Sequence, residues 1–401
     1  MTNAQNKKMK ITEISVTPVP SYYPKELGKN AFSDNIGKQR LEWIVRARTA
    51  DGVEGVTIAN RTVRQGRVED LLELLKTSLL GREVDSLLQV QNGVVTGPGA
   101  DVARTFRSTR WMDALAFDLY GKLHNVSAIS LLGGKVRAAV PAYDTTLYFQ
   151  DFLVPEKGAK QVAEEAAEAK AAGYRALKIK TGRGGRWMMP EAGMQRDVDV
   201  VLGVREAVGE NFHIYVDANF GYDDRLDLLE DFIRETIPAN IYWLEEMITH
   251  DVAGYRAMRE MQAKHGSKAL LVCGETDRDP ISETFRHLIE DGLIDGYQPD
   301  IVGAGYLRWI EIEQALRGTE VRSIPHNFGN GTFGTFATLA FGAASKTFVS
   351  LEDERNLPHI FGPYPPFKAG AYQVEERPGL GISVDEDLFQ EKYALHEWQV
   401  E

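Results

Sequence analysis

The sequence predicts an α/β fold, a closed (β/α)7β barrel of the TIM type with an α+β cap built from the N-terminal segment and the C-terminal tail. Two observations predict the barrel. From about residue 138, eight short apolar strands alternate with seven helices, and repeated βα units of this number form a closed parallel barrel. Charged residues also stand at one end of these strands, although strands covered by helices should be apolar throughout.

The eight predicted barrel strands are short and rich in apolar residues. An open doubly wound sheet is the rival architecture, but it usually carries a glycine-rich turn after its first strand, and residues 140–149 contain no glycine. The predicted strands are 140–146, 176–180, 213–219, 241–247, 269–275, 295–301, 320–327 and 347–353.

The chain before the barrel has a different pattern. Residues 11–20 and 41–60 alternate as strands do, and the second stretch contains an Asp-Gly turn at 51–52. Apolar residues at helical spacing predict helices over 67–81 and 102–125. Strands followed by helices are typical of a small α+β unit.

The tail carries two further strand-like stretches, 371–376 and 381–386, which we expect to pack back on the cap. The chain is therefore predicted to divide into a cap (1–137), a barrel (138–354) and a C-terminal segment that returns to the cap (355–401).

Composition narrows the possible partners. A formal net charge of −12 argues against nucleic acid and against an anionic membrane as partners. Cys273 is the single cysteine, so an intrachain disulfide is excluded and a reducing compartment is favoured. The first 16 residues lack the apolar core of a signal peptide, and no run of 18 apolar residues occurs. These features predict a cytoplasmic protein.

Polar residues end seven of the eight strands, and this is the most informative pattern in the sequence. One aspartate after a strand is usually a helix cap or a turn residue. A set that recurs every 25 to 37 residues, about one βα unit, instead predicts an active site, because barrel enzymes place it at these strand ends. The set comprises Lys178, Lys180, Asp217, Glu245, Glu246, Glu275, Asp300, His326 and Glu352.

Three of these carboxylates, Asp217, Glu245 and Glu275, come from consecutive strands and should converge. Unpaired, they would repel one another in a poorly solvated barrel mouth. A hard divalent cation with oxygen ligands resolves the repulsion, so we predict one Mg²⁺ per chain, with Mn²⁺ as a possible substitute. Zinc is less favoured because the trio contains no histidine or cysteine. Glu246 should point away from Glu245 by strand alternation.

The lysines and the histidine predict acid–base chemistry. Lys178 and Lys180 lie two residues apart, so both should face the barrel interior. Adjacent ammonium groups near a dication lower each other's proton affinity, which favours Lys180 as a base. His326 should face it across the barrel, with its imidazole oriented by Asp300. Two such groups on opposite faces of a substrate suit either inversion at carbon or removal of a proton and a leaving group from different sides.

The ordered motifs LKIK, VDAN, WLEE, CGE, QPD and PHN resemble the enolase superfamily in its mandelate-racemase-like subgroup. Residues 112–143 resemble that family's passage from cap to barrel, and residues 378–387 resemble its return to the cap. The resemblance implies Mg²⁺ on the carboxylate trio and Lys180 as base, with Lys178 beside it. It also implies that His326 and Asp300 act as the second acid–base pair and that Glu352 hydrogen-bonds the substrate carboxylate or the developing enediolate.

The sequence departs from the family pattern at two places. Met247 stands where the family often has proline after the acidic pair, and the loop over 181–195 is long. The loop contains Arg183, Arg186 and Trp187, and loops at this end of a barrel line the pocket.

The family includes racemases and many acid-sugar dehydratases, and the resemblance favours dehydration of a sugar acid to a 2-keto-3-deoxy acid. Residues 21–39 resemble the family's specificity loop, so Tyr22, Tyr23 and Asn30 are predicted to contact substrate, the alternative being a solvated loop. A racemase or epimerase by two-base proton transfer is the second hypothesis. A non-catalytic binding protein is the third, disfavoured because uncompensated buried charges are costly. A homo-oligomer is expected.

Overall fold

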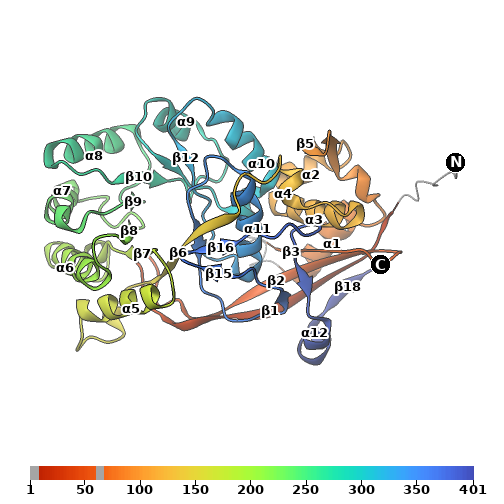
Figure 1. The fold of residues 1–401 in the computed structure, drawn as a ribbon, viewed down its shortest axis with the longest axis horizontal. Helices are drawn as coiled ribbons and strands as arrows, with labels where there is room; N and C mark the ends of the chain where they lie inside the picture. Colours follow the sequence, from red (N-terminus) through yellow and green to blue (C-terminus); the bar gives the residue numbers. More distant parts are fainter. Residues whose placement is uncertain (1–8, 60–66) are drawn as a thin grey trace.

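The predicted barrel is present in the computed structural model, which describes residues 9–59 and 67–401 (Figure 1). All eight strands fall where the sequence places them, and each points its carboxyl end to the same side because they are parallel. The strands are β6 (Ala139–Leu147), β7 (Ala176–Lys180), β8 (His213–Asp217), β9 (Trp243–Glu245), β10 (Leu270–Cys273), β11 (Gly296–Tyr297), β12 (Arg322–Ser323) and β13 (Leu351–Asp353).

The ring of strands closes between its last two members. The strands pair in sequence order from β6 to β12, and β13 pairs with β6. Two backbone hydrogen bonds bridge the remaining gap: the Ser323 amide donates to the Thr347 carbonyl (3.3 Å), and the Val349 amide donates to the Ser323 carbonyl (3.2 Å).

Seven helices follow the first seven strands and cover the barrel from outside. α7 buries Leu228, Leu229, Phe232 and Ile233 on one face, as expected for an amphipathic helix on a sheet, whereas α11 is buried on all sides. Among helices of the described ranges, none is long and apolar enough to cross a membrane. They are α5 (Ala159–Ala171), α6 (Pro190–Val208), α7 (Leu226–Glu235), α8 (Val252–His265), α9 (Glu283–Glu290), α10 (Ile301–Ala315) and α11 (Gly331–Ala344).

The cap is a four-stranded antiparallel sheet with helices beside it. Its order is β18-β1-β2-β3, and the Asp-Gly turn lies between β2 and β3, with Gly52 at a φ of +82° that favours glycine. Asn60, the last residue of the predicted strand pair, lies outside the described residues. The elements of the cap are β1 (Ile11–Leu27), β2 (Gly37–Thr49), β3 (Glu54–Ile58), α1 (Val68–Leu79), β4 (Leu88–Gln91), β5 (Val94–Pro98), α2 (Ala103–Ser108), α3 (Asp113–His124), α4 (Ala128–Leu131) and β18 (Trp398–Val400).

The single helix predicted over 102–125 is wrong. The chain leaves helical geometry at Thr109 (φ −132°, ψ 67°), so α2 and α3 are separate helices. The break turns Asp113 toward α10, where its carboxylate accepts the amides of Tyr306 (3.0 Å) and Leu307 (2.8 Å). Gly305, at a φ of +74°, interrupts α10 at this point and frees these donors. The Asp113 carboxylate at the break between α2 and α3 therefore accepts the two backbone amides that the kink in α10 leaves without helical partners.

The C-terminal segment contacts both parts of the molecule. Its last strand, β18, pairs with β1 of the cap, whereas β16 pairs with the first barrel strand, β6, a contact that the sequence did not predict. The division of the chain at residues 137 and 354 stays a prediction. The remaining elements are β14 (Phe361–Gly362), β15 (Phe367–Lys368), β16 (Ala371–Gln373), β17 (Ser383–Val384) and α12 (Glu386–Lys392).

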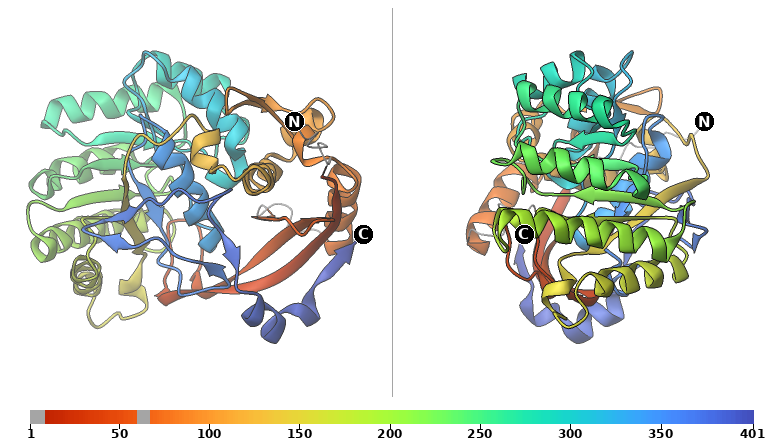
Figure 2. Two further views of the ribbon diagram at one scale, coloured as in Figure 1. Left: turned by 45° about the vertical axis from the view of Figure 1, so that its right-hand side comes forward. Right: turned by 90° about the vertical axis from the view of Figure 1, so that its left-hand side faces the viewer.

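The long β1–β2 hairpin reaches from the cap to the barrel, as its red ribbon shows in Figure 2. Its tip is held by loops that follow three barrel strands. The Phe149 amide after β6 donates to the Lys29 carbonyl (2.9 Å), the Trp187 indole after β7 donates to the Asn30 carbonyl (2.7 Å), and the Leu357 amide after β13 donates to the Tyr22 carbonyl (2.9 Å). The hairpin therefore lies at the end of the barrel where the charged residues gather.

Candidate active site

The parallel register brings the predicted site residues together. Lys180, Asp217 and Glu245 are direct register partners on β7, β8 and β9, so their side chains form one row. Glu275 follows β10, and Asp300 and His326 form a backbone bridge beyond β11 and β12. Parallel strands that end at a common level place these residues in one barrel mouth.

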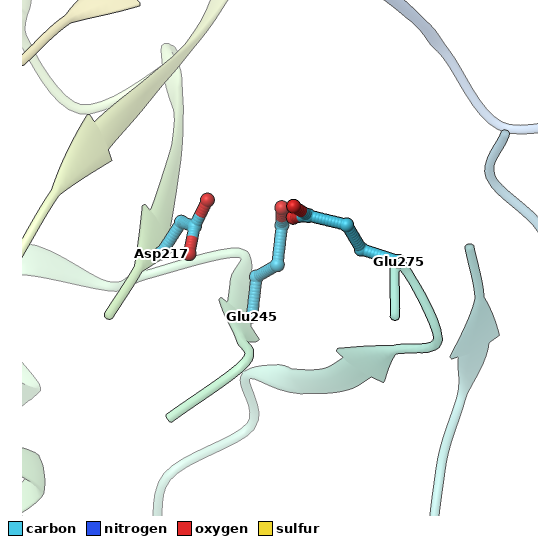
Figure 3. Close-up of side chains that lie close together, drawn as sticks. All are labelled: Asp217, Glu245 and Glu275. Carbon is cyan, nitrogen blue, oxygen red and sulfur yellow. The ribbon is translucent and has the colours of Figure 1, made fainter. Parts of the chain in front are cut away.

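Asp217, Glu245 and Glu275 converge as the sequence predicts. One oxygen of each lies within 4.8 Å of the other two. Asp217 and Glu245 are fully buried, while the Glu275 side chain keeps 21% of its exposure. Figure 3 shows the carboxylates of Glu245 and Glu275 meeting, with Asp217 facing them from the neighbouring strand. Three carboxylates at this spacing form a hard oxygen-donor set suited to a divalent cation.

The two lysines pair with these carboxylates. Lys178 Nζ lies 2.6 Å from Glu245 Oε1, 2.7 Å from Glu352 Oε1 and 3.4 Å from Asp217 Oδ2. Lys180 pairs with Asp217. Both ammonium groups face the barrel interior, and both lysines are at least 95% buried, since Lys178 keeps 1% and Lys180 4% of its exposure.

The expected lowering of the lysines' proton affinity near a dication stays a prediction, and without a cation the carboxylates act in the opposite direction on Lys178. Burial disfavours its charged form, but the carboxylates of Glu245 and Glu352 outweigh burial and hold the Lys178 pKa well above its ordinary value. For Glu245, burial dominates and raises the carboxyl pKa to about 8 against the pull of Lys178. Among Asp217, Glu245 and Glu352, burial prevails at Glu245, whereas the lysines and other partners lower the pKa values of Asp217 and Glu352.

His326 is oriented from the opposite side of the mouth. Its Nδ1 lies 3.0 Å from Asp300 Oδ2, which also accepts a hydrogen bond from Asn330 Nδ2 (2.7 Å). The other ring nitrogen, Nε2, lies 3.7 Å from Glu275 Oε2 and 3.8 Å from Glu352 Oε2. Burial lowers the imidazole pKa, but these three carboxylates overcome it and raise the pKa to about 10. The imidazolium is therefore available as a proton donor.

Glu352 occupies the centre of the cluster. Its Oε1 accepts from Thr145 Oγ1 and Lys178 Nζ, each at 2.7 Å, and its Oε2 accepts from the amides of Asn327 (2.8 Å) and Phe328 (3.0 Å). Burial raises its pKa, but Lys178 and His326 reverse this and hold the pKa well below the ordinary value. Glu352 is thus a fixed carboxylate that links the lysine side of the site to the histidine side.

The three predicted loop contacts separate in the structure. Tyr23 is fully buried and stacks on Phe328 with ring centroids 5.9 Å apart. Tyr22 points to the other face of the hairpin and keeps 43% of its exposure. The Asn30 side chain caps its own loop, because its Oδ1 accepts the amides of Phe32 (3.1 Å) and Ser33 (2.7 Å). Of the three, only Tyr23 joins the aromatic cluster beside the site.

The fold and this geometry agree with the comparisons to known proteins. The sequence pattern of the family described as Enolase C-terminal domain-like matches residues 161–388, more than half of the chain. The chain belongs to this family. The resemblance of the sequence motifs to the enolase superfamily is therefore confirmed.

Similar members of the superfamily act on acid sugars and related compounds. The chain is 26% identical over 300 residues to a D-galactarolactone cycloisomerase of Agrobacterium fabrum, covering 70% of this chain and 72% of that protein. It is 26% identical to a galacturonate dehydratase from Geobacillus sp., solved with D-galacturonate and 5-keto-4-deoxy-D-galacturonate. The two structures have a TM-score of 0.82, and the match covers 99% of this chain and 100% of that one. It is also 26% identical to a mandelate racemase/muconate lactonizing protein from Geobacillus sp. Y412MC10, solved with magnesium and tartrate. The TM-score is 0.80, and the match covers 96% of this chain and 95% of that one.

Two residues beside this site were not among the predicted site residues, although Arg183 was noted in the loop after Lys180. Tyr148 follows β6, is 1% exposed, and places its ring centroid 5.3 Å from Lys180 Nζ and 5.3 Å from the Phe328 ring. Arg183 is fully buried, binds Asp151 and Asp197, and donates to the Lys180 carbonyl (3.2 Å). No periodicity marks Tyr148, whereas a charged residue three positions after Lys180 was a usable signal for Arg183.

Glu246 and Trp243 each form a hydrogen bond with a residue of the carboxylate trio. Glu246 follows the end of β9 at a φ of +47°, and its Oε1 accepts the amides of Gly274 (2.9 Å) and Glu275 (3.1 Å). Glu246 therefore holds the backbone of a trio member without joining the trio. Strand alternation could also have placed Trp243 inside the barrel, two residues before Glu245.

Proposed function

We propose that this protein is a Mg²⁺-dependent acid-sugar dehydratase, a lyase that removes water from a sugar acid to give a 2-keto-3-deoxy acid. The observation that carries the proposal is the placement of two acid–base groups, Lys180 and the His326–Asp300 pair, on either side of the carboxylate trio. Dehydratase activity in a relative that covers nearly the whole chain supports the same reaction class.

The carboxylate trio fits Mg²⁺. It offers oxygen donors alone, and the pKa of Glu245 is raised mainly because burial disfavours its charged form, which a bound cation would favour. Asp217, Glu245 and Glu275 would hold one ion per chain, with Mn²⁺ as a substitute, and a relative solved with magnesium supports this assignment. The cation's charge would stabilise the negative charge that develops on the substrate carboxylate as the neighbouring C–H bond breaks.

Lys180 takes the proton from the carbon next to the substrate carboxylate. His326, as an imidazolium oriented by Asp300, gives its proton to the departing 3-hydroxyl, so that water leaves from the other face. His326 is then neutral, takes up a proton from water and delivers it to C3 while the enol hydroxyl releases its own proton, which gives the 2-keto acid; Lys180 returns its proton to solvent. Lys178 and Glu352 pair with each other at 2.7 Å, and Glu352 is proposed to hydrogen-bond the substrate carboxylate or the developing enediolate when it carries a proton.

A library of aldonic, aldaric and uronic acids, incubated with the protein and Mg²⁺, tests the proposed reaction. We expect at least one member to release a keto acid, detected by semicarbazide absorbance and by NMR. Inversion of a 2-hydroxy acid without keto acid would instead identify the racemase or epimerase, which the same two-sided geometry supports. Saturable binding of a sugar acid with no turnover across the library would identify a binding protein.

The hydroxyl of Tyr23 is the hairpin group that we propose as a substrate contact. It is buried and makes no hydrogen bond of standard geometry within residues 9–59 and 67–401, and the Glu354 carboxylate is its competing partner, since burial and then Glu354 raise its pKa. Tyr23→Phe should raise KM about tenfold if the hydroxyl binds the substrate, the effect of one hydrogen bond worth about 1.4 kcal/mol. Tyr22→Phe is the matched control and should leave steady-state kinetics unchanged, since Tyr22 lies on the outer face.

Equal KM values for wild type, Tyr23→Phe and Tyr22→Phe would show that the hairpin only covers the site. Substrate contact by Asn30 remains part of the proposal, through movement of its loop. The homo-oligomeric state and the cytoplasmic location stay predictions.

A further inference from the structure

Trp243 lies directly beneath the carboxylate trio. It begins β9, two residues before Glu245, so both side chains face the barrel interior. The indole is fully buried, and its Nε1–H donates to Glu245 Oε2 at 3.1 Å. One of the three proposed metal ligands is therefore hydrogen-bonded by a neutral side chain from its own strand.

Aromatic neighbours fix the orientation of the indole. The Tyr215 ring, from β8, stacks on it with centroids 3.4 Å apart and planes 14° from parallel. The Tyr143 ring, from β6, meets it edge-on at 5.3 Å and 89°. Rings packed on two sides leave the indole little freedom to rotate, so Tyr143 and Tyr215 set the direction of its Nε1–H.

Trp243 and Lys178 each hold one oxygen of Glu245. Lys178 contacts Oε1 at 2.6 Å, and Trp243 contacts Oε2 at 3.1 Å, which together define the plane of the carboxylate. Each carboxylate oxygen can accept more than one interaction, so both contacts leave room for a cation. The two donors differ in charge: an ammonium is repelled by a divalent cation, whereas an indole is not.

We propose that Trp243 is a positioning residue that orients the Glu245 carboxylate for Mg²⁺. The inference rests on the proposed function, because it takes Glu245 as a metal ligand. Partners that orient metal ligands usually change metal affinity about 10-fold to 100-fold when removed. The indole of Trp243 keeps its contact with Glu245 when a cation binds, because it is neutral. The rings packed on it hold the indole in place, and its hydrogen bond in turn holds the Glu245 carboxylate.

Direct Mn²⁺ binding to the full-length protein, measured by the loss of the free-ion EPR signal, tests the proposal without any catalytic assay. Trp243→Phe keeps an aromatic ring between Tyr143 and Tyr215 but removes the N–H donor. We expect its dissociation constant for Mn²⁺ to rise about 10-fold or more relative to wild type. Wild-type affinity in a folded Trp243→Phe protein would overturn the proposal.

Trp309 provides a matched control. It is also fully buried and packs on Phe341, and its Nε1 has no hydrogen-bond partner in the described part of the chain. Trp309→Phe should bind Mn²⁺ as wild type does, and an equal loss in both variants would overturn the specific role of Trp243.

Replacing Trp243 by benzothienylalanine covers the case in which Trp243→Phe does not fold. This analogue keeps the shape of the indole and substitutes sulfur for N–H, so the proposal again requires weaker Mn²⁺ binding, and unchanged binding would overturn it. Failure of the proposed function looks different: wild-type protein that does not bind Mn²⁺ would remove the metal site itself, and the role of Trp243 with it.

Discussion

Lys180→Ala should reduce dehydration about 100-fold to 10,000-fold, the range expected when a positioned acid–base group is removed. A hydrogen next to a carboxylate is a very weak acid, so its removal needs a base at the right face. Lys180 is at least 95% buried and paired with Asp217, which fixes its side-chain nitrogen at the end of β7, where it acts as a base in its neutral amine form. The same variant should lose exchange of the substrate's α-hydrogen with D₂O, followed by NMR, if that hydrogen faces the lysine.

His326→Asn should lose dehydration to a similar extent but should still exchange the α-hydrogen through Lys180. The imidazole pKa, raised to about 10 by Glu275, Glu352 and Asp300 against burial, makes it the proton donor for the departing hydroxyl. Loss of this donor blocks elimination without removing the base. If the α-hydrogen faces His326, the exchange results of the two variants should reverse.

A racemase would give a different pattern, because each single variant would retain exchange for one enantiomer only. Lys264→Ala and His265→Asn are matched controls, since both residues lie on α8 outside the barrel and pair with Glu230. Dehydration at the wild-type rate in one of the two site variants would remove that residue from the mechanism, and in both would defeat the two-sided arrangement.

Chelation with EDTA should abolish activity, and excess Mg²⁺ or Mn²⁺ should restore it. Stabilisation of developing charge by a bound cation is worth several kcal/mol, which corresponds to about 1,000-fold or more in rate. Asp217→Asn should lose activity to a similar degree, because it removes one ligand and the partner of Lys180. EDTA that is saturated with Mg²⁺ beforehand is the control and should have no effect.

The fold should survive chelation. Asp217 and Glu245 already pair with Lys178 and Lys180, so the carboxylates are partly neutralised without a cation. The melting temperature measured by circular dichroism should therefore change little while activity is lost. Full activity in chelated, metal-free protein would contradict the metal assignment.

The barrel could be predicted because its pattern is repetitive and local. Each strand is a short apolar run and the first seven are followed by a helix, so a misjudged boundary in one unit leaves the others intact. The helix break at Thr109 was not predicted, because it depends on a contact between segments far apart in the sequence. Nothing local marks it, since its cause is the pair of amides at the Gly305 kink of α10, which Asp113 satisfies from almost two hundred residues away.

The residues of the site also differ in how well the sequence predicts their positions. Residues on strands, such as Lys180, Asp217 and Glu245, follow a period of two, so their direction can be read from the sequence and their meeting from the parallel register. Residues on loops have no such period. Tyr22 and Asn30 were predicted as substrate contacts because residues 21–39 resemble a specificity loop; in the structure Tyr22 is 43% exposed and the Asn30 side chain caps its own loop, so their contact with substrate stays a prediction.

The sequence alone determined the barrel, the strand ends that carry charge and the family to which the chain belongs, because these depend on residue order along each strand. Only the tertiary structure decided which groups are close enough to interact. It set the pairing of Lys178 with Glu245 and Glu352, the position of Tyr148 beside Lys180, and the indole of Trp243 under Glu245. Charge–charge interactions and hydrogen bonds depend on distance and burial, and these follow from the closure of the ring rather than from any one segment.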